Sequence, residues 1–353
     1  DEATPSIFPF MSPFADECYA PRRCLENDLA AVHGRICAVK SQELDLTPRL
    51  EKLMNEFVNL LVPRPHIGVP VDYDEVYERQ ARPAQRHILD EACAGSVVAD
   101  QRRLETFQKA ETYAEPNDPR IITTMPPSEK LEYSCFTYAF AEHLREEGVA
   151  EWYAFGKNPL EVAERVAEVC LLARRSVKMT DFSRFDGRVS NILRELERRF
   201  MMRFFMRPFH ARLAEIQARQ KDRRSRTKFG VKFDTGSARL SGSSETADFN
   251  SVDNAFVAYV AKRNSPNADG SEKGPEQAWT ELGIYGGDDG LTADVDDDTY
   301  VRAATEVGQK LTSEDVLRGK PGVSFLARIY SPEVWFGCLD SMCDVKRQLI
   351  KFH

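Results

Sequence analysis

The most constraining feature of this chain is a pair of adjacent aspartates, Asp288 and Asp289, set among glycines between two short apolar stretches. The segment Leu282–Thr292 predicts a strand, a tight turn and a returning strand, and Gly286 and Gly287 permit the sharp reversal. Neighbouring carboxylates repel each other, so their placement at a turn is favourable mainly where a cation binds. Mg²⁺ and Mn²⁺ prefer such oxygen ligands. By itself, the segment also fits an ordinary acidic surface hairpin.

The composition is that of a globular protein. The chain has 353 residues, of which 42% are hydrophobic and 29% charged, enough for a large core and two or three subdomains. No apolar run approaches the roughly 20 residues that a membrane-spanning helix needs. The sequence starts at Asp1 without an initiator methionine or a signal-peptide pattern. We therefore expect it to be a fragment of a longer protein.

Charge is unevenly distributed along the chain. The formal net charge is −8, which by itself argues against a polyanionic partner. However, residues 188–232 contain fourteen Lys or Arg against four acids, whereas six of the eleven residues in 288–298 are Asp. One basic segment and one acidic focus suit an enzyme that holds a phosphate backbone near a metal centre.

The eight cysteines are scattered through the sequence. Cys135 and Cys170 lie in apolar or helical contexts, which predicts buried free thiols. A second group has residue types that can bind zinc but lacks the closely paired spacing of common structural zinc sites: Cys18, Cys24, His33 and Cys37.

Hydrophobic periodicity and breaker residues predict a mixture of helices and strands. Residues 1–45 are expected to form an extended arm, and 219–228 a basic loop or helix end. A long helix beginning near residue 189 is expected to kink at Pro208. The other predicted helices are 46–62, 74–80, 83–94, 128–147, 158–175, 245–262 and 296–309, followed by a short helical tail at the C-terminus. The predicted strands are 104–113, 120–125, 177–182, 231–234 and 322–330.

Several weak signals follow one another in a defined order. A strand ending at Asp181 is followed five residues later by Asp186. A flexible turn then precedes a helix, and the Asp288–Asp289 hairpin follows that helix. Each signal is common alone, but their order and structural setting make coincidence a poor explanation. Polar residues of the turn and helix are Ser241, Gly242, Thr246 and Asn250, and an upstream hairpin presents Lys109, Glu111 and Arg120.

This series resembles the palm motifs of RNA-dependent RNA polymerases from positive-strand RNA viruses. Asp181-Phe-Ser-Arg-Phe-Asp186 resembles motif A, Ser241 through Asn250 motif B, and Gly287-Asp-Asp289 motif C. Lys109, Glu111 and Arg120 resemble the fingertip motif F, and Val323-Ser-Phe-Leu-Ala-Arg328 resembles motif E. The residues around the motifs are most similar to those of nodavirus replicases. The motifs span about two thirds of the chain, residues 104–330.

The resemblance implies an α+β right-hand polymerase fold. Its palm would be an antiparallel sheet with an RRM-like core, flanked by mostly helical fingers. Residues 1–176 would form the N-terminal arm and fingers, with the fingertip motif at 104–125. Residues 177–330 would form the palm, with a fingers insertion at about 188–240. Residues 331–353 would begin a thumb that is largely missing.

The resemblance also implies the chemistry. Asp181, Asp288 and Asp289 would be catalytic ligands of two Mg²⁺ or Mn²⁺ ions, as phosphoryl transfer to a 3′-hydroxyl requires. Asp186 and Asn250 would recognise the ribose 2′-hydroxyl, supported by Ser241, Gly242 and Thr246. The two fingertip cations would neutralise the triphosphate while their acidic neighbour orients them. The expected RNA-binding residues are Arg223, Arg224, Arg226, Lys228 and Arg328.

The implied partners are template and product RNA and nucleoside triphosphates. Membrane association is expected only through other parts of a replicase, at membrane-bound replication complexes in the host cytoplasm such as those of the mitochondrial outer membrane. A homo-oligomer is also compatible with the resemblance.

The sequence departs from the family pattern at two points. No lysine aligns clearly with the general acid of motif D, and only about 23 residues follow motif E.

Two other functions remain open from the sequence. One is a non-catalytic RNA-binding fragment that cannot synthesise RNA without a thumb. The other is a palm enzyme that builds DNA, against which the pair of Asp186 and Asn250 argues, since a DNA-building enzyme needs a bulky side chain near the ribose. The sequence does not distinguish primed from de novo initiation and does not specify the template.

Overall fold

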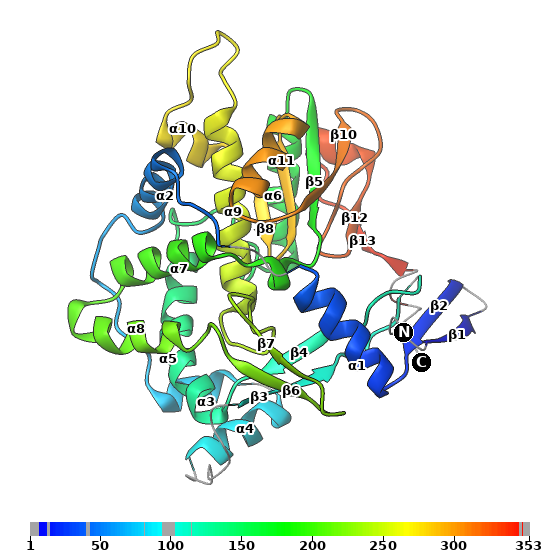
Figure 1. Ribbon diagram of the computed structural model, residues 1–353. Helices are drawn as coiled ribbons and strands as arrows, with labels where there is room; N and C mark the ends of the chain where they lie inside the picture. Colours follow the sequence, from blue (N-terminus) through cyan, green and yellow to red (C-terminus); the bar gives the residue numbers. More distant parts are fainter. Residues whose placement is uncertain are drawn as a thin grey trace.

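A computed structural model describes residues 7–12, 15–39, 43–80, 82–93, 103–113, 115–345 and 348. Helices and four small sheets alternate along these residues, so the predicted α+β class is confirmed. Figure 1 shows the long helix α9 (Thr246–Asn264) running through the middle of the molecule between the sheets and the other helices. Within the described ranges, no helix has both the length and the apolar composition needed to cross a bilayer.

The central sheet contains the Asp288–Asp289 segment. Its antiparallel strands follow the order β10 (Leu311–Leu317), β5 (Ser176–Phe182), β9 (Asp289–Ala293) and β8 (Ile284–Gly286). β8 and β9 form the predicted hairpin. β10 was not predicted from the sequence, because this edge strand buries only a few of its side chains and lacks an apolar alternation.

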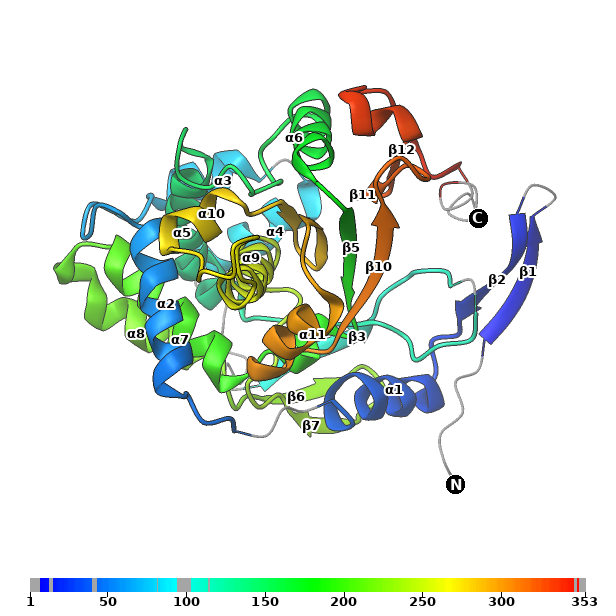
Figure 2. The same ribbon diagram turned by 90° about the horizontal axis from the view of Figure 1, so that it is seen from above.

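Helices cover both faces of the central sheet. α6 (Pro159–Leu172) packs on one face and begins with a capping box between Asn158 and Glu161. α9 and α11 (Asp297–Glu306) lie on the other face. Figure 2 shows the strands β5 and β10 between these helices. The sheet that carries the carboxylate turn is therefore held between two layers of helices.

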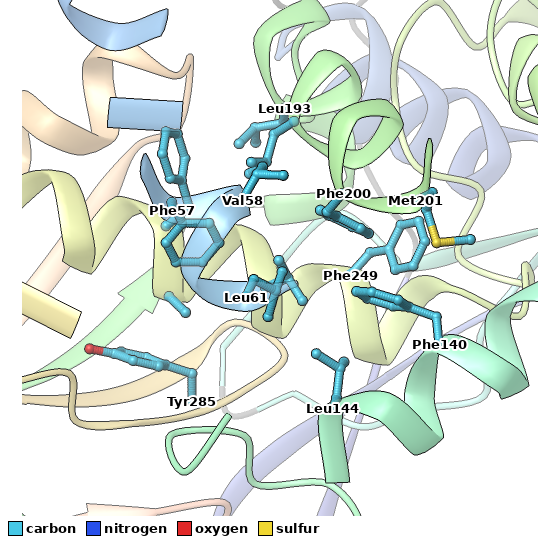
Figure 3. Packing of buried hydrophobic residues seen from close by; sticks show 14 of the residues in the cluster. Phe57, Val58, Leu61, Phe140, Leu144, Leu193, Phe200, Met201, Phe249 and Tyr285 are labelled. Atoms are coloured by element: carbon cyan, nitrogen blue, oxygen red, sulfur yellow. The ribbon is translucent and has the colours of Figure 1, made fainter. Parts of the chain in front are cut away.

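The main hydrophobic core gathers around α9. Every residue from Phe249 to Lys262 is buried, so this helix is enclosed on all sides. Aromatic rings from two helices meet Phe249 in its N-terminal half: Phe140 of α5 (Pro127–Arg145) and Phe200 of α7 (Asn191–Phe204), which stack on each other with ring centroids 4.8 Å apart. Figure 3 shows this cluster together with side chains of α2 (Pro48–Leu61). The core thus fixes the position of the helix that carries the predicted motif B residues.

A second sheet corrects one prediction. Its strands follow the order β4 (Ile121–Thr124), β3 (Arg103–Gln108), β6 (Arg224–Thr227) and β7 (Lys232–Asp234). The expectation of a basic loop or helix end at 219–228 was therefore wrong over β6. Its inward side chains are hydroxyls rather than apolar groups, and Ser225 Oγ lies 2.6 Å from Thr106 Oγ1 on β3. A polar inner row of this kind carries no hydrophobic alternation.

The predicted long helix with a kink at Pro208 was also wrong. α7 ends at Phe204, and a short 3₁₀ turn (Arg207–Phe209) separates it from α8 (His210–Ala218). The backbone between them is extended, and the N–H of Met206 donates to the carbonyl of Gly68. Pro208 therefore begins a new helical segment instead of bending an existing one.

The described residues near both ends form elements that were not predicted from the sequence. The N-terminal arm forms a hairpin of β1 (Ile7–Ser12) and β2 (Ala15–Pro21), which projects from the body in Figure 2. α1 (Leu25–Val32) follows and continues into a π-helical turn, η1 (His33–Cys37). The remaining short helices are α3 (Tyr73–Arg79), α4 (Pro83–Cys93) and α10 (Pro275–Thr280).

The expected single strand at 322–330 is a hairpin of β11 (Ser324–Phe325) and β12 (Arg328–Tyr330), with Leu326 and Ala327 at positive φ between them. A 3₁₀ helix (Pro332–Phe336) and β13 (Ser341–Cys343), which pairs with β12, come next. Of the expected helical tail, Val345 and Gln348 are helical, and the other residues after Val345 lie outside the described part of the chain.

Candidate active site

Three of the predicted carboxylates meet at one end of the central sheet. Asp288 lies in the turn between β8 and β9, where Gly287 has a φ of 68° that suits glycine. The pairing of Thr180 with Gly290 places the next residue of β5, Asp181, beside Asp289 of β9. Both of these aspartates line a cavity of about 420 Å³, whereas Asp288 and Asp289 line a larger one of about 610 Å³. Asp289 therefore stands between the two cavities.

The surroundings of Asp288 raise the pKa of its carboxyl. Burial raises the pKa of its carboxyl, and the negative charges of Asp181 and Asp186 raise it further, while its backbone hydrogen bond and the positive charge of Arg120 lower it. A divalent cation would relieve this repulsion, and the donors are the hard oxygens that such a cation prefers. However, no three His, Cys, Asp or Glu side chains of the described residues are grouped closely enough to hold a metal ion.

The predicted ribose-recognition residues form one hydrogen-bonded network. Ser241 Oγ donates to Asp186 Oδ2 over 2.5 Å, and Asn250 Nδ2 donates to Asp186 Oδ1 over 2.8 Å. The three residues come from a 3₁₀ turn (Phe185–Arg188), the loop before α9, and α9 itself. All of them line the 610 Å³ cavity.

The other two predicted motif B residues shape the loop. The hydroxyl of Thr246 donates to the carbonyls of Leu240 and Ser243, each over 3.1 Å, and so closes the loop before α9. Gly242 donates its N–H to the carbonyl of Thr123 over 3.0 Å, and a Cβ on Gly242 would lie only 2.7 Å from that oxygen. Glycine is thus required for the close approach of this loop to β4.

The fingertip residues also lie together. Glu111 is placed between the two cations, 3.5 Å from Lys109 Nζ and 3.7 Å from Arg120 Nη1. The N–H of Lys109 donates to the carbonyl of Arg120, which extends the β3–β4 hairpin beyond its last paired strand residues. Lys109 and Arg120 line the same cavity as Asp288. Their charges are therefore placed opposite the acidic turn.

Arg35 and Arg184 also line this cavity, as does Arg239 of the network described below, and none of the three was predicted from the sequence. Arg35 Nη2 donates to the carbonyl of Asp118 over 2.7 Å, and Arg184 Nη2 lies 2.5 Å from Asp118 Oδ2. Arg184 also donates to the carbonyl of Gly34. Burial lowers the pKa of Arg35. Their contacts join segments far apart in the sequence, so no local pattern could reveal them.

A buried ionic network supports the Asp186 loop from behind. Arg239 Nη2 lies 2.7 Å from both Glu197 Oε1 and Asp253 Oδ2, and all three side chains are buried. The N–H of Arg239 donates to the carbonyl of Asp186 over 2.8 Å. Glu245 belongs to the same network, and burial raises the pKa of its carboxyl to about 7. No sequence pattern pointed to this network beyond an excess of charged residues.

The predicted RNA-binding residues do not all lie on one surface. Arg223 lies only 2.8 Å from Glu129 and its side chain is 12% exposed, so it is committed to an ion pair. Arg328 is on β12, away from the second sheet, where its Nε donates to Ser341 Oγ. The structure thus does not bring Arg328 together with the other four.

The remaining basic residues lie on β6 or directly after it. The side chains of Arg224, Arg226 and Lys228 are exposed, and the last two line a cavity of about 1200 Å³ on the second sheet. Phe107 and Phe229 line this cavity too and are each 44% exposed. Exposed aromatic rings beside cations are the usual features of a surface that binds single-stranded nucleic acid.

The cysteines give a mixed outcome. Cys135 and Cys170 are buried free thiols, as predicted, and burial raises the pKa of each to about 12. Cys24, His33 and Cys37 lie in or next to α1 and η1 and, within the described part of the chain, form no metal-binding group. The side chain of Cys18 lies outside the described residues.

Comparison with known proteins identifies the relatives of this chain. No protein-family model matches it. Its curated relatives include the RNA-directed RNA polymerases of Striped jack nervous necrosis virus, 34% identical over 97% of this chain, and of Pariacoto virus, 33% identical over 94%. The chain is a homologue of the nodavirus RNA-directed RNA polymerases. The resemblance inferred from the motifs is therefore confirmed.

The similarity to the nodavirus enzymes covers nearly the whole chain but only part of each relative. This chain spans about one third of their length: 34% for the Striped jack nervous necrosis virus protein and 33% for the Pariacoto virus protein. The polymerase of Macrobrachium rosenbergii nodavirus is 29% identical over 80% of this chain and 27% of its own length.

Proposed function

We propose that this chain contains the nucleotidyl-transfer centre of an RNA-dependent RNA polymerase that replicates a positive-strand viral RNA genome. One observation carries the proposal: the 610 Å³ cavity is lined by Asp288 and Asp289, by the Asp186 network and by the fingertip cations. A nucleoside triphosphate presents a triphosphate, a ribose 2′-hydroxyl and a site of phosphoryl transfer, and these lining groups can recognise all three.

The roles of the residues follow from their chemistry. Lys109 and Arg120 would neutralise the triphosphate, and Asp186 would accept a hydrogen bond from the 2′-hydroxyl. Asp181, Asp288 and Asp289 would hold divalent cations. Two bound Mg²⁺ or Mn²⁺ ions would stabilise the attacking and leaving oxygens of the in-line transfer. Burial is the main cause of the raised pKa of Asp288, and the negative charges of Asp181 and Asp186 add to it; a bound cation would offset the repulsion from these two charges.

We further propose that the central sheet is the palm and the second sheet part of the fingers of a right-hand polymerase. Template RNA would run over the second sheet, where Arg226, Lys228, Phe107 and Phe229 line a common cavity. The chain would act within a larger replicase at host membranes, which other parts of that protein would contact.

Primer extension tests the proposal. We expect the chain to extend an annealed RNA primer with NTPs and Mg²⁺ or Mn²⁺, and Asp288→Ala to lower the rate by about a thousandfold or more, since metal coordination contributes several kcal/mol to the transition state. Asp298→Ala is the matched control, because this exposed aspartate lies on α11 and lines neither cavity.

Two outcomes would contradict the proposal. Equal incorporation by the wild type and Asp288→Ala would show that the metal assignment is wrong. RNA binding without incorporation by the wild type would favour the alternative of a non-catalytic RNA-binding fragment.

A further inference from the structure

Two side chains of α9 form hydrogen bonds with the backbone of the turn that carries Asp288. Asn254 Nδ2 lies 3.2 Å from three consecutive carbonyl oxygens, those of Gly287, Asp288 and Asp289. Ser251 Oγ accepts a hydrogen bond from the N–H of Gly287 over 2.8 Å and donates to the carbonyl of Ala247. Both residues are 0% exposed. The backbone of the turn thus has its partners on α9 rather than in water.

These contacts leave the turn little freedom. Only the amide nitrogen of Asn254 can face three carbonyl oxygens, because an oxygen there would repel all of them. Gly290 lies close to the same amide, and a Cβ on Gly290 would lie 3.3 Å from Asn254 Nδ2 and 2.6 Å from Thr180 Oγ1. Helix, turn and β5 are therefore packed at a separation that only glycine allows.

The same helix also carries the ribose-recognition network. Asn250 donates to Asp186 and lies one helical turn before Asn254, and residues four apart share a helix face. One face of α9 therefore contacts the loop of Asp186 and the turn of Asp288 within two successive turns. Since α9 is enclosed by the main core, the two regions are held in a fixed relation.

We propose that Asn254 and Ser251 are positioning residues, which orient the peptides of Gly287 through Asp289 so that the two aspartates present their carboxylates to divalent cations. The inference rests on the proposed function for the role of those cations. It assigns Asn254 and Ser251 no contact with the substrate. Their effect is on the geometry, and hence the affinity, of the cation site.

The test measures cation binding directly, without RNA or nucleotide. Mn²⁺ binding by the whole chain can be followed by electron paramagnetic resonance, and folding by circular dichroism. We expect Asn254→Ala to weaken Mn²⁺ binding about tenfold or more, because it leaves buried carbonyls without their donor. Ser251→Ala should weaken it similarly, whereas Ser251→Thr keeps the hydroxyl and should restore binding.

A second readout separates positioning from a general structural role. In primer extension, Asn254→Ala should raise the metal concentration needed for half-maximal rate and leave the preference for ribonucleotides unchanged. Asn250→Ala, on the same helix face, should show the opposite pattern. A folded Asn254→Ala variant with wild-type Mn²⁺ affinity would overturn the inference. If that variant does not fold, equal Mn²⁺ affinities for Ser251→Ala and Ser251→Thr would overturn it instead.

The two proposals fail in different ways. If the wild type binds Mn²⁺ in a manner that depends on Asp288 and Asn254 but never extends a primer, the positioning role stands and the polymerase assignment fails. If it extends primers and Asn254→Ala changes neither Mn²⁺ binding nor metal dependence, only the positioning role fails.

Discussion

Replacing Asp186 with alanine tests whether this chain recognises ribose as the cavity suggests. The wild-type carboxylate accepts hydrogen bonds from Ser241 and Asn250 and remains half-buried at the cavity wall, where one more donor can reach it. A ribose 2′-hydroxyl is such a donor, and a 2′-deoxyribose is not. Asp186→Ala should therefore weaken the preference for NTPs over dNTPs.

The expected size of this effect follows from the charge of the acceptor. A hydrogen bond to a charged group contributes about 1.5–3 kcal/mol, which corresponds to a factor of about 10–150 in the NTP/dNTP ratio of kcat/KM. The fold should survive, because the link from Arg239 to this loop uses the main-chain carbonyl of Asp186. Asn250 Nδ2 would lose its partner, at a cost of about 1–3 kcal/mol of stability.

The assay compares kcat/KM for ATP and 2′-deoxy-ATP on one primed template. Asp186→Asn is the matched variant: it keeps an oxygen acceptor but loses the charge, so we expect a smaller loss of discrimination than in Asp186→Ala. If Asp186→Ala folds, extends primers and discriminates as the wild type does, Asp186 does not recognise ribose.

Three further predictions concern the surroundings of the site. Gly242→Ala should lower the free energy of unfolding by about 1–3 kcal/mol, since its methyl would meet the carbonyl of Thr123, and an unchanged urea midpoint would refute this. Burial raises the pKa of Glu245 from 4.5 to about 7, so between these pH values the folded state binds more protons than the unfolded state. Stability should therefore fall as pH rises from 4.5 to 7. Glu245→Gln should flatten that dependence in thermal melts. Arg120→Ala should shift the midpoint of a pH titration of Mn²⁺ binding upward, because the charge of Arg120 lowers the pKa of Asp288, and a downward shift would contradict this.

Much of the site could be predicted from the sequence because its residues lie in short segments with strong local signals. The glycines around Asp288 predict a hairpin, and a hairpin is what β8 and β9 form. The spacing of Thr246 and Asn250 predicts one helix, and both lie on α9. Local patterns sufficed here because backbone reversals and helix faces depend on neighbouring residues.

Sequence patterns failed where polar groups replace apolar ones. β6 turns hydroxyls inward to meet those of β3, and β10 is an edge strand with few buried side chains, so neither shows the alternation that identifies strands. The break at Pro208 was misread because its outcome depends on Met206 bonding to Gly68, a residue remote in sequence.

The sequence by itself determined the order of the motifs, the residue types of the acidic and ribose-recognition groups, and the resemblance to nodavirus polymerases that the relatives confirm. Tertiary structure alone decided which groups share a cavity: Arg35 and Arg184 join the fingertip cations, and Asn254 bonds the turn of Asp288. The physical reason is that such contacts depend on how closely packed elements approach one another. That separation is set by the whole core, and no short stretch of sequence encodes it.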